Sequence, residues 1–387
     1  YVLVTPYTIA KSRIGGVLSR LLSQVDLQLV GAQIIAPDEK FAHDYAEILR
    51  RQNTGSNITL LASYAERNLA PSGGRRHRTL LLLFRGENPC GKLVTICGHL
   101  HSEHRLNDIE TLPGETIRDT YADLILAPDD PGTVTYFEPA VITPRIQEEA
   151  DEDMALFAAF LRGQKNLVQN IHYEDPSVIE QTLVIIKPDN WTQPSSKPGT
   201  IVDMFSRTGL RIIGIKVHRF SLAEALEFYG PVEQALQEKL APVYGRKARE
   251  ILEREMGLAL DAQAEAALTE QVGAVYARDQ FRRIIKYMSG MRPEDCPDGD
   301  TRKPGAVMCL ILYYEGENAI RKIRDVLGPT DPLKAPGGTV RREFGSNVME
   351  NTAHASDSPE SVARERGIVR INENDLLGII EEHLRAG

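Results

Sequence analysis

Cysteine is scarce in this sequence. Four occur among 387 residues, at Cys90, Cys97, Cys296 and Cys309, with no CxxC pair and no histidine at the spacing of a metal ligand. Disulfide and zinc scaffolds draw their cysteines together in short, regular spacings, so the pattern argues against both. It is typical of a reduced protein. The sequence therefore predicts a cytoplasmic protein without a protein-bound metal.

Long apolar runs and an excess of positive charge are missing too. No run approaches the length of a membrane-spanning helix, and nothing at the start of the sequence has the pattern of a signal peptide. The net charge is −9, whereas proteins that coat nucleic acids need a basic face that displaces counterions. The composition argues against a membrane or nucleic acid as partner. Any nucleotide site must be a local basic pocket.

The sequence is long enough for two domains of ordinary size, and it contains an internal repeat. Similar short segments recur in the same order, and Asn88 and Asn318 both precede a glycine by ten residues. The matched segments are residues 29–31 with 212–214, 82–88 with 312–318, and 113–118 with 336–341. Repeats of this kind determine the architecture, so we predict two related domains in tandem.

Strand and helix patterns follow one another in the same way in both halves. The expected strands are 1–6, 27–35, 79–84, 181–187, 209–220 and 306–314, and the expected helices include 15–22, 41–50, 199–206, 221–229 and 318–327. Paired strands and two helices per copy favour an α+β fold of two ferredoxin-like βαββαβ domains, each an antiparallel sheet with helices on one face.

The domain boundaries follow from composition. The predicted first domain is residues 1–163, the linker 164–180 and the second domain 181–387. The second domain carries a helical insertion at about 231–278 and a loop insertion at about 290–304.

One stretch of the second half suggests chemistry. Residues 328–341 contain too much Pro and Gly for a helix or a central strand, so they predict an ordered loop that ends at the cation Arg341. Ser358 and Pro359 are a good N-cap and first helical residue, which puts free N–H groups and a positive helix end near His354. A neutral imidazole there can attack a phosphoryl group. A lone histidine before a helix is more often a capping or surface residue.

Several motifs in one order resemble the signature of nucleoside diphosphate kinases. They are Ile185-Ile186-Lys187-Pro188-Asp189, Thr330-Asp331-Pro332, residues 336–341 and Asn351-Thr352-Ala353-His354-Ala355-Ser356-Asp357-Ser358. No gap is needed between Arg324 and Glu365. The resemblance implies His354 as the phosphorylated nucleophile, Glu365 as its orienting partner, Ser356 as its support, Tyr229 near the phosphohistidine, Lys187 and Asn351 on the ribose, Arg324, Thr330 and Arg341 on the phosphates, Phe281 beneath the base and Val348 beside it.

The resemblance also implies the reaction and its partners. These are ping-pong transfer of the γ-phosphate of ATP to a nucleoside diphosphate, with Mg²⁺ bound through the nucleotide phosphates rather than by protein ligands. An aromatic face accepts any base, which predicts tolerance among nucleotides. Family members assemble from dimers, so we predict a pseudo-dimer between the two halves and a possible homo-oligomer.

The first half lacks the chemical groups of the second. Thr5 stands where the second half has Lys187, Val94 stands where it has Arg324, and no histidine follows Arg118 before the linker. Neither Thr nor Val holds a phosphate by charge. We interpret the first half as a degenerate, structural copy.

Departures from the family pattern leave an alternative open. Ala355 replaces the usual glycine after the histidine, and Arg342-Glu343 replace the usual Gly-Asp. The insertions could form a lid, a partner surface or a block. A catalytically weak or inactive nucleotide-sensing or scaffolding protein of the same fold is therefore the alternative function.

Two polar loops of the first half are less specific. Residues 71–78 are basic and could bind phosphate, but a solvated hairpin-type loop is the simpler interpretation. His99, His101 and His104 have a spacing that fits no common zinc pattern, which favours an exposed loop.

Overall fold

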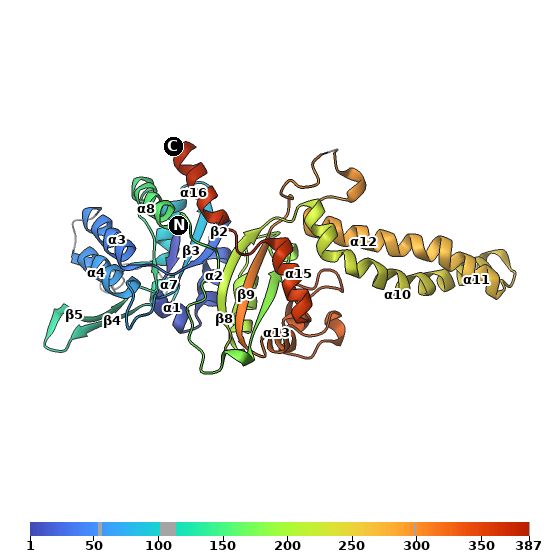
Figure 1. The fold of residues 1–387 in the computed structure, drawn as a ribbon, viewed down its shortest axis with the longest axis horizontal. Coiled ribbons are helices and arrows are strands. Elements are labelled where there is room, and N and C mark those ends of the chain that lie inside the picture. The colour runs from blue at the N-terminus through green and yellow to red at the C-terminus, as the bar shows by residue number, and fades with distance from the viewer. Residues whose placement is uncertain (53–55, 101–113, 298, 387) are drawn as a thin grey trace. The chain divides into compact units, whose positions relative to one another are not determined.

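The structure is a computed structural model that describes residues 1–52, 56–100, 114–297 and 299–386 (Figure 1). Contacts group the chain into two compact units. The first comprises Tyr1–Val217, Leu310–Arg366 and Arg370–Gly387, and the second comprises His218–Cys309 and Gly367–Val369. This division differs from the predicted pair of halves, because both β-sheets belong mainly to the first unit. Within the described residues, no helix is both long and apolar enough to cross a membrane.

The first sheet has the strand order β2-β3-β1-β6 with antiparallel neighbours. Its strands are β1 (Val2–Val4), β2 (Gln28–Ile35), β3 (Thr79–Arg85) and β6 (Val141–Ile142). The helices of this half are α1 (Pro6–Ala10), α2 (Ile14–Gln24), α3 (Glu39–Arg51), α4 (Ser56–Tyr64), α5 (Pro89–Cys97), α7 (Ile117–Tyr121) and α8 (Gln147–Leu161). A separate hairpin pairs β4 (Asp123–Ala127) with β5 (Asp130–Glu138).

Helices cover both faces of the first sheet. Leu80 and Leu82 of β3 join a buried cluster with α2 and α5, whereas Leu81 and Leu83 join another with α3 and α8. The unbroken leucine run of β3 is the physical reason, since alternate side chains of a strand point to opposite faces and both faces here are apolar. The predicted antiparallel sheet is present. The expectation of helices on one face only is wrong for this sheet.

The second sheet has the order β10-β7-β9-β8. Its strands are β7 (Ile179–Ile186), β8 (Arg211–His218), β9 (Cys309–Glu317) and β10 (Ala353–Ala355). The helices around it are α9 (Lys197–Ser206), α13 (Ala319–Leu327), α14 (Val340–Phe344) and α15 (Pro359–Val369). Read from the opposite edge, the order is β8-β9-β7-β10. In both sheets the strands that come second, third, first and fourth along the chain therefore lie side by side in that order.

The two sheets share unusual backbone positions as well as strand order. Asn88 and Asn318 precede equivalent helices with φ of 45° and 52°, and Ala140 and Thr352 precede equivalent edge strands with φ of 61° and 69°. Non-glycine residues rarely adopt such left-handed conformations. Their recurrence at matched positions means that the halves follow the same local path.

Helices α2 and α9 pack against each other between the sheets. Gly15 of α2 lies against the backbone of Asp203, and Gly199 of α9 lies against the backbone of Ser19. Glycine permits this approach because it has no Cβ. One buried cluster contains residues of α2 and α9 together with strands of both sheets.

The last helix, α16 (Asp375–Ala386), packs on β2 and α8 of the first sheet. Leu376 and Ile380 are buried there, and Gly31 leaves room for Leu376, whose Cδ1 would lie 2.3 Å from a Cβ at that glycine. The Nδ2 atom of Asn374 donates to the carbonyl of Leu161 (3.0 Å). The end of the chain therefore packs on the first sheet, and the predicted 181–387 boundary stays a prediction.

The second unit is a helical hairpin. Its helices are α10 (Leu222–Met256), α11 (Ala262–Leu268) and α12 (Ala274–Ser289). A capping box begins α10, because Ser221 accepts from the backbone N–H of Glu224 and Glu224 accepts from that of Ser221. Figure 1 shows α10 and α12 side by side, and the rings of Tyr244 and Tyr276 stack between them at 3.5 Å.

The sequence pattern predicted that helix α10 ends at Tyr229, and this prediction is wrong. The helix continues through Pro231 and Pro242 to Met256. Proline removes a backbone donor and clashes with the preceding turn, so a helix that contains two needs support from elsewhere. Packing of α12 along α10 supplies this support.

Candidate active site

His354 lies on β10, one of the two edge strands of the second sheet. It pairs in antiparallel register with Ile185 of β7, while its neighbours Ala353 and Ala355 are buried. Thr352 precedes the strand with φ of 69°, and the N-cap Ser358 follows it and begins α15. The short strand thereby holds the imidazole between a turn and the helix start that the sequence predicted at Ser358 and Pro359.

A buried carboxylate orients the imidazole. His354 Nε2 lies 2.9 Å from Glu365 Oε2, and the Ser356 hydroxyl donates to the same oxygen (2.7 Å). Arg364 Nη2 lies 3.4 Å from the other oxygen, Oε1. Glu365 is 3% exposed, whereas the His354 side chain is 23% exposed. Because a carboxylate accepts hydrogen bonds, the pairing assigns the proton to Nε2 and the lone pair to Nδ1.

Lys187, Thr330, Val348 and Asn351 are brought together by hydrogen bonds. Lys187 Nζ donates to Asn351 Oδ1 (2.7 Å), and Asn351 Nδ2 donates to the carbonyls of Thr330 (3.1 Å) and Val348 (2.8 Å). Lys187 and Asn351 are buried, but Thr330 and Val348 are exposed. A lysine charge beside exposed residues of two loops is suited to a polar, anionic ligand.

Arg341 joins the long loop to β10. Its Nη1 donates to the carbonyl of Gly328 and its Nη2 to the carbonyl of Ala353, both at 3.0 Å. These bonds clamp the start of the loop against the strand that carries His354. The phosphate contact expected of Arg341 stays a prediction.

Arg324 lies in the last turn of α13 and is exposed. The hydrogen bond from the Ser361 hydroxyl lowers the pKa of the Asp357 carboxyl, and Arg324 and the His354 ring lower it further. Asp357 is thus within electrostatic reach of both Arg324 and His354.

Tyr229 and Phe281 lie in the second unit, on α10 and α12. Both are buried, with 7% and 5% of their surface exposed. Their predicted places near the phosphohistidine and beneath the base stay predictions.

Sequence reasoning missed Asp357 and Arg364. Both are adjacent in sequence to residues that it identified, Ser356 and Glu365, but a charged residue at a helix start or on a helix looks like any solvated one. Among the described residues, no cluster of three or more His, Cys, Asp or Glu side chains is able to hold a metal. His101 and His104 lie outside the described residues.

The first sheet has the same framework without these groups. Ile142 pairs with Leu3 of β1 where His354 pairs with Ile185 of β7. The N–H of Thr5 donates to the carbonyl of Ala140 (3.1 Å), as that of Lys187 donates to the carbonyl of Thr352 (2.9 Å). Apolar or uncharged side chains thus stand at the positions that correspond to His354 and Lys187.

Comparison with known proteins identifies relatives. The family model described as "Nucleoside diphosphate kinase" matches residues 299–373. The nucleoside diphosphate kinase of Bdellovibrio bacteriovorus is 33% identical over 187 residues, which are 48% of this chain and 89% of the relative. That of Paracoccus denitrificans is 33% identical over 187 residues, 48% of this chain and 90% of the relative.

A solved structure is similar as well. The crystal structure of an NDP kinase from Pyrobaculum aerophilum has 27% sequence identity and a TM-score of 0.33, and the match covers 49% of this chain and 94% of that one. The family assignment rests on the sequence relatives, which are matched over most of their length. The chain belongs to the nucleoside diphosphate kinase family.

Proposed function

We propose that this chain is a nucleoside-diphosphate kinase that transfers the γ-phosphate of ATP to a nucleoside diphosphate through a phosphohistidine at His354. The observation that carries the proposal is the bond between His354 Nε2 and the buried Glu365. It fixes the ring and its tautomer and leaves the lone pair on Nδ1 as the nucleophile.

The reaction proceeds in two balanced steps. Nδ1 of His354 attacks the γ-phosphorus, the bond from phosphorus to the bridging oxygen breaks, and ADP leaves. A terminal β-phosphate oxygen of the second nucleotide then attacks the phosphohistidine, and the phosphorus–nitrogen bond breaks. Glu365 stabilises the cationic ring of the intermediate in both directions.

Cationic side chains supply the charge that phosphoryl transfer requires. Lys187, Arg324 and Arg341 are the proposed contacts of the ribose and phosphates, together with Thr330 and Asn351. We propose that Mg²⁺ arrives on the nucleotide and neutralises charge on its phosphates. Broad base tolerance follows if the base contacts apolar side chains such as Phe281 and Val348.

We further propose that the first half is a degenerate copy and forms a pseudo-dimer with the second. Support comes from the shared strand order, the matched left-handed residues and the close packing of α2 on α9. Homo-oligomers can form in addition through surfaces outside this contact. We propose the cytoplasm as its compartment, because the spacing of the four cysteines in the sequence is typical of a reduced protein.

Incubation with γ-labelled ATP tests the proposal. The full chain is expected to acquire a label that is labile in acid and stable in base, and His354→Ala is expected to acquire none. Glu365→Gln keeps the nucleophile but weakens stabilisation of the cationic ring, so its labelling should slow on the order of 100-fold. His43→Ala is the matched control, because His43 is 59% exposed.

Two outcomes would contradict the proposal. Absence of label in the folded parent chain would exclude a phosphohistidine route. Tight nucleotide binding by calorimetry, without turnover, would favour the nucleotide-sensing or scaffolding alternative.

A further inference from the structure

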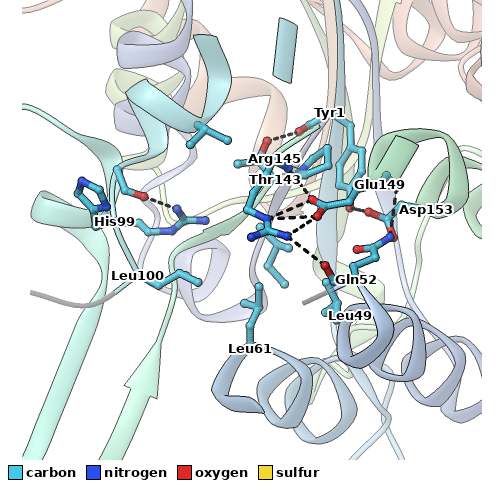
Figure 2. A pocket seen from close by; sticks show the side chains of 15 residues that line it. Tyr1, Leu49, Gln52, Leu61, His99, Leu100, Thr143, Arg145, Glu149 and Asp153 are labelled. Carbon is cyan, nitrogen blue, oxygen red and sulfur yellow. Dashed lines mark hydrogen bonds and ion pairs between the residues drawn. The ribbon is translucent and has the colours of Figure 1, made fainter. Parts of the chain in front are cut away.

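The first half contains a pocket of about 330 Å³ that the proposed kinase reaction does not use (Figure 2). Its apolar wall is formed by Leu49, Leu61, Leu100 and Ile142. Ile142 occupies the position equivalent to His354, so the pocket lies where the second half has its nucleophile. It therefore has the place of a nucleotide site but not the chemistry of one.

Arg118 lines the pocket and is buried, with 8% of its surface exposed. Its Nη1 donates to the carbonyl of Gly98 and its Nη2 to that of Val141 (3.0 Å), the same pair of bonds that Arg341 makes to Gly328 and Ala353. The Nε atom of Arg118 is buried without an acceptor. No carboxylate of the described residues forms an ion pair with Arg118. A buried guanidinium that lines a pocket and has no carboxylate partner favours an anion close to it.

The other Arg, Asp and Glu side chains of the pocket already have partners. Arg145 pairs with Glu149 at 2.6 Å, as Figure 2 shows, and Glu149 is buried. Asp153 accepts from the Tyr1 hydroxyl (2.7 Å) and from Gln52 (3.2 Å). Arg118 is thus the one guanidinium of the described lining that has no carboxylate partner, and two carboxyl groups line the same pocket. That balance suits a single negative charge and disfavours a polyphosphate.

We propose that this pocket binds a small organic monoanion with an apolar body, such as an aromatic carboxylate, whose carboxylate lies at Arg118 and whose body fills the apolar wall. Thr5 and Val94 offer no charge in place of Lys187 and Arg324, so a nucleotide phosphate chain lacks its partners here. The inference is independent of the kinase proposal, because it involves neither His354 nor turnover.

Calorimetric titration of the full chain with 2-naphthoate tests this site. The comparison probes are 2-naphthamide, its uncharged isostere, and acetate, a carboxylate without an aromatic ring. We expect 2-naphthoate to bind at least about tenfold more tightly than either, because only it satisfies both the cation and the apolar wall. Mg-ADP should leave its affinity unchanged.

Variants locate the binding site. Arg118→Met should weaken 2-naphthoate binding at least about tenfold. Because Arg118 also clamps the backbone, Val94→Phe provides a second variant that fills the pocket and leaves the guanidinium in place, and it should weaken binding to a similar degree. Arg162→Met is the matched control, since Arg162 is 69% exposed and lies outside the pocket.

The proposal is overturned if 2-naphthoate does not bind, if 2-naphthamide binds equally well, or if both Arg118→Met and Val94→Phe bind like the parent. Competition by Mg-ADP would place the ligand in a nucleotide site instead and would also overturn it. If the full chain takes no label from ATP but binds 2-naphthoate as expected, the kinase proposal is contradicted and the proposal for this pocket is not.

Discussion

Two buried carboxyl groups show how surroundings decide the use of a residue. Glu365 accepts from His354 and Ser356, and Arg364 lies close to it, so its charge is compensated. Asp153 accepts only from the neutral groups of Tyr1 and Gln52, and no cation of the described residues forms an ion pair with it. Burial raises the pKa of Asp153 to about 7. Glu365 thus has charged and hydrogen-bonding partners, whereas burial destabilises the charged form of Asp153.

The raised pKa of Asp153 predicts that the chain loses stability as pH rises. The folded state holds the proton up to about pH 7, whereas the unfolded state releases it near the ordinary value of 3.8. The stabilisation is thus complete below 3.8 and is lost as pH rises through about 7. Between pH 5 and 8 the parent should lose about 3 kcal/mol relative to Asp153→Asn, which mimics the protonated form.

Urea unfolding of both proteins at several pH values measures this difference. Asp123→Asn is a suitable control, because Asp123 has no comparable burial. A constant difference in the free energy of unfolding between parent and Asp153→Asn from pH 5 to 8 would contradict the assignment.

At the scale of single residues, the sequence identified those candidate site residues that belong to local motifs. His354, Ser356 and Glu365 are close in sequence, and the turn and helix between them are local, so their meeting could be foreseen. The engagement of Arg341 with Gly328 and Ala353 could not, because it depends on how a loop closes. Arg118 and its pocket were missed for the same reason.

At the scale of elements, periodicity identified most strands and helices of both sheets. Strand β3 and helix α13 were expected almost at their observed bounds, since apolar runs and periodic helices carry strong local signals. The sequence predicted that helix α10 ends at Tyr229, because Gly230 and Pro231 are residues that commonly end a helix. Its continuation depends on packing against α12, which no local pattern contains.

The contact of α2 with α9 yields a prediction for Gly199. A Cβ at this position would lie 2.2 Å from the backbone N of Ser19 and 2.4 Å from the carbonyl of Gly15. Backbone atoms cannot move aside cheaply, so Gly199→Ala should destabilise the first unit by about 2–3 kcal/mol in spite of alanine's better helix propensity. Thermal unfolding followed by circular dichroism measures the effect.

Gly378→Ala is the matched control. Gly378 lies within α16, and a methyl group added there would have none of the described atoms outside its own helix turn within 4 Å. Its replacement should be neutral or stabilising by roughly 0.5–1 kcal/mol. Faster proteolysis of the 164–180 linker in Gly199→Ala alone would support the pseudo-dimer, and equal stability of both variants would argue that α2 and α9 do not pack closely.

At the scale of the molecule, the internal repeat of the sequence is the basis of the proposed pair of related domains. The return of α16 to the first sheet was invisible, because the contacts of Leu376 join positions far apart in the chain. Long-range packing of this kind is decided by complementary surfaces rather than by local pattern.

The division into two units predicts that the distal part of the hairpin can be removed. His354, Glu365, Lys187 and Arg341 all belong to the first unit. In the second unit, Gly273 lies so close to Ala241 that a Cβ there would be 2.0 Å from the Ala241 carbonyl. The two backbones are therefore adjacent, and a turn of about four glycine and serine residues is long enough to replace residues 242–272.

The shortened chain should fold and be labelled by ATP at His354 within about threefold of the parental rate, because deletions are tolerated where the affected backbone has few partners in the rest of the fold. Tyr229 and Phe281 are retained in it, so the test isolates the distal hairpin. His354→Ala in the shortened background shows that any label is at the same residue. If the shortened chain has the expected circular dichroism spectrum but takes no label, the distal hairpin is required for phosphoryl transfer and the catalytic machinery is not confined to the first unit.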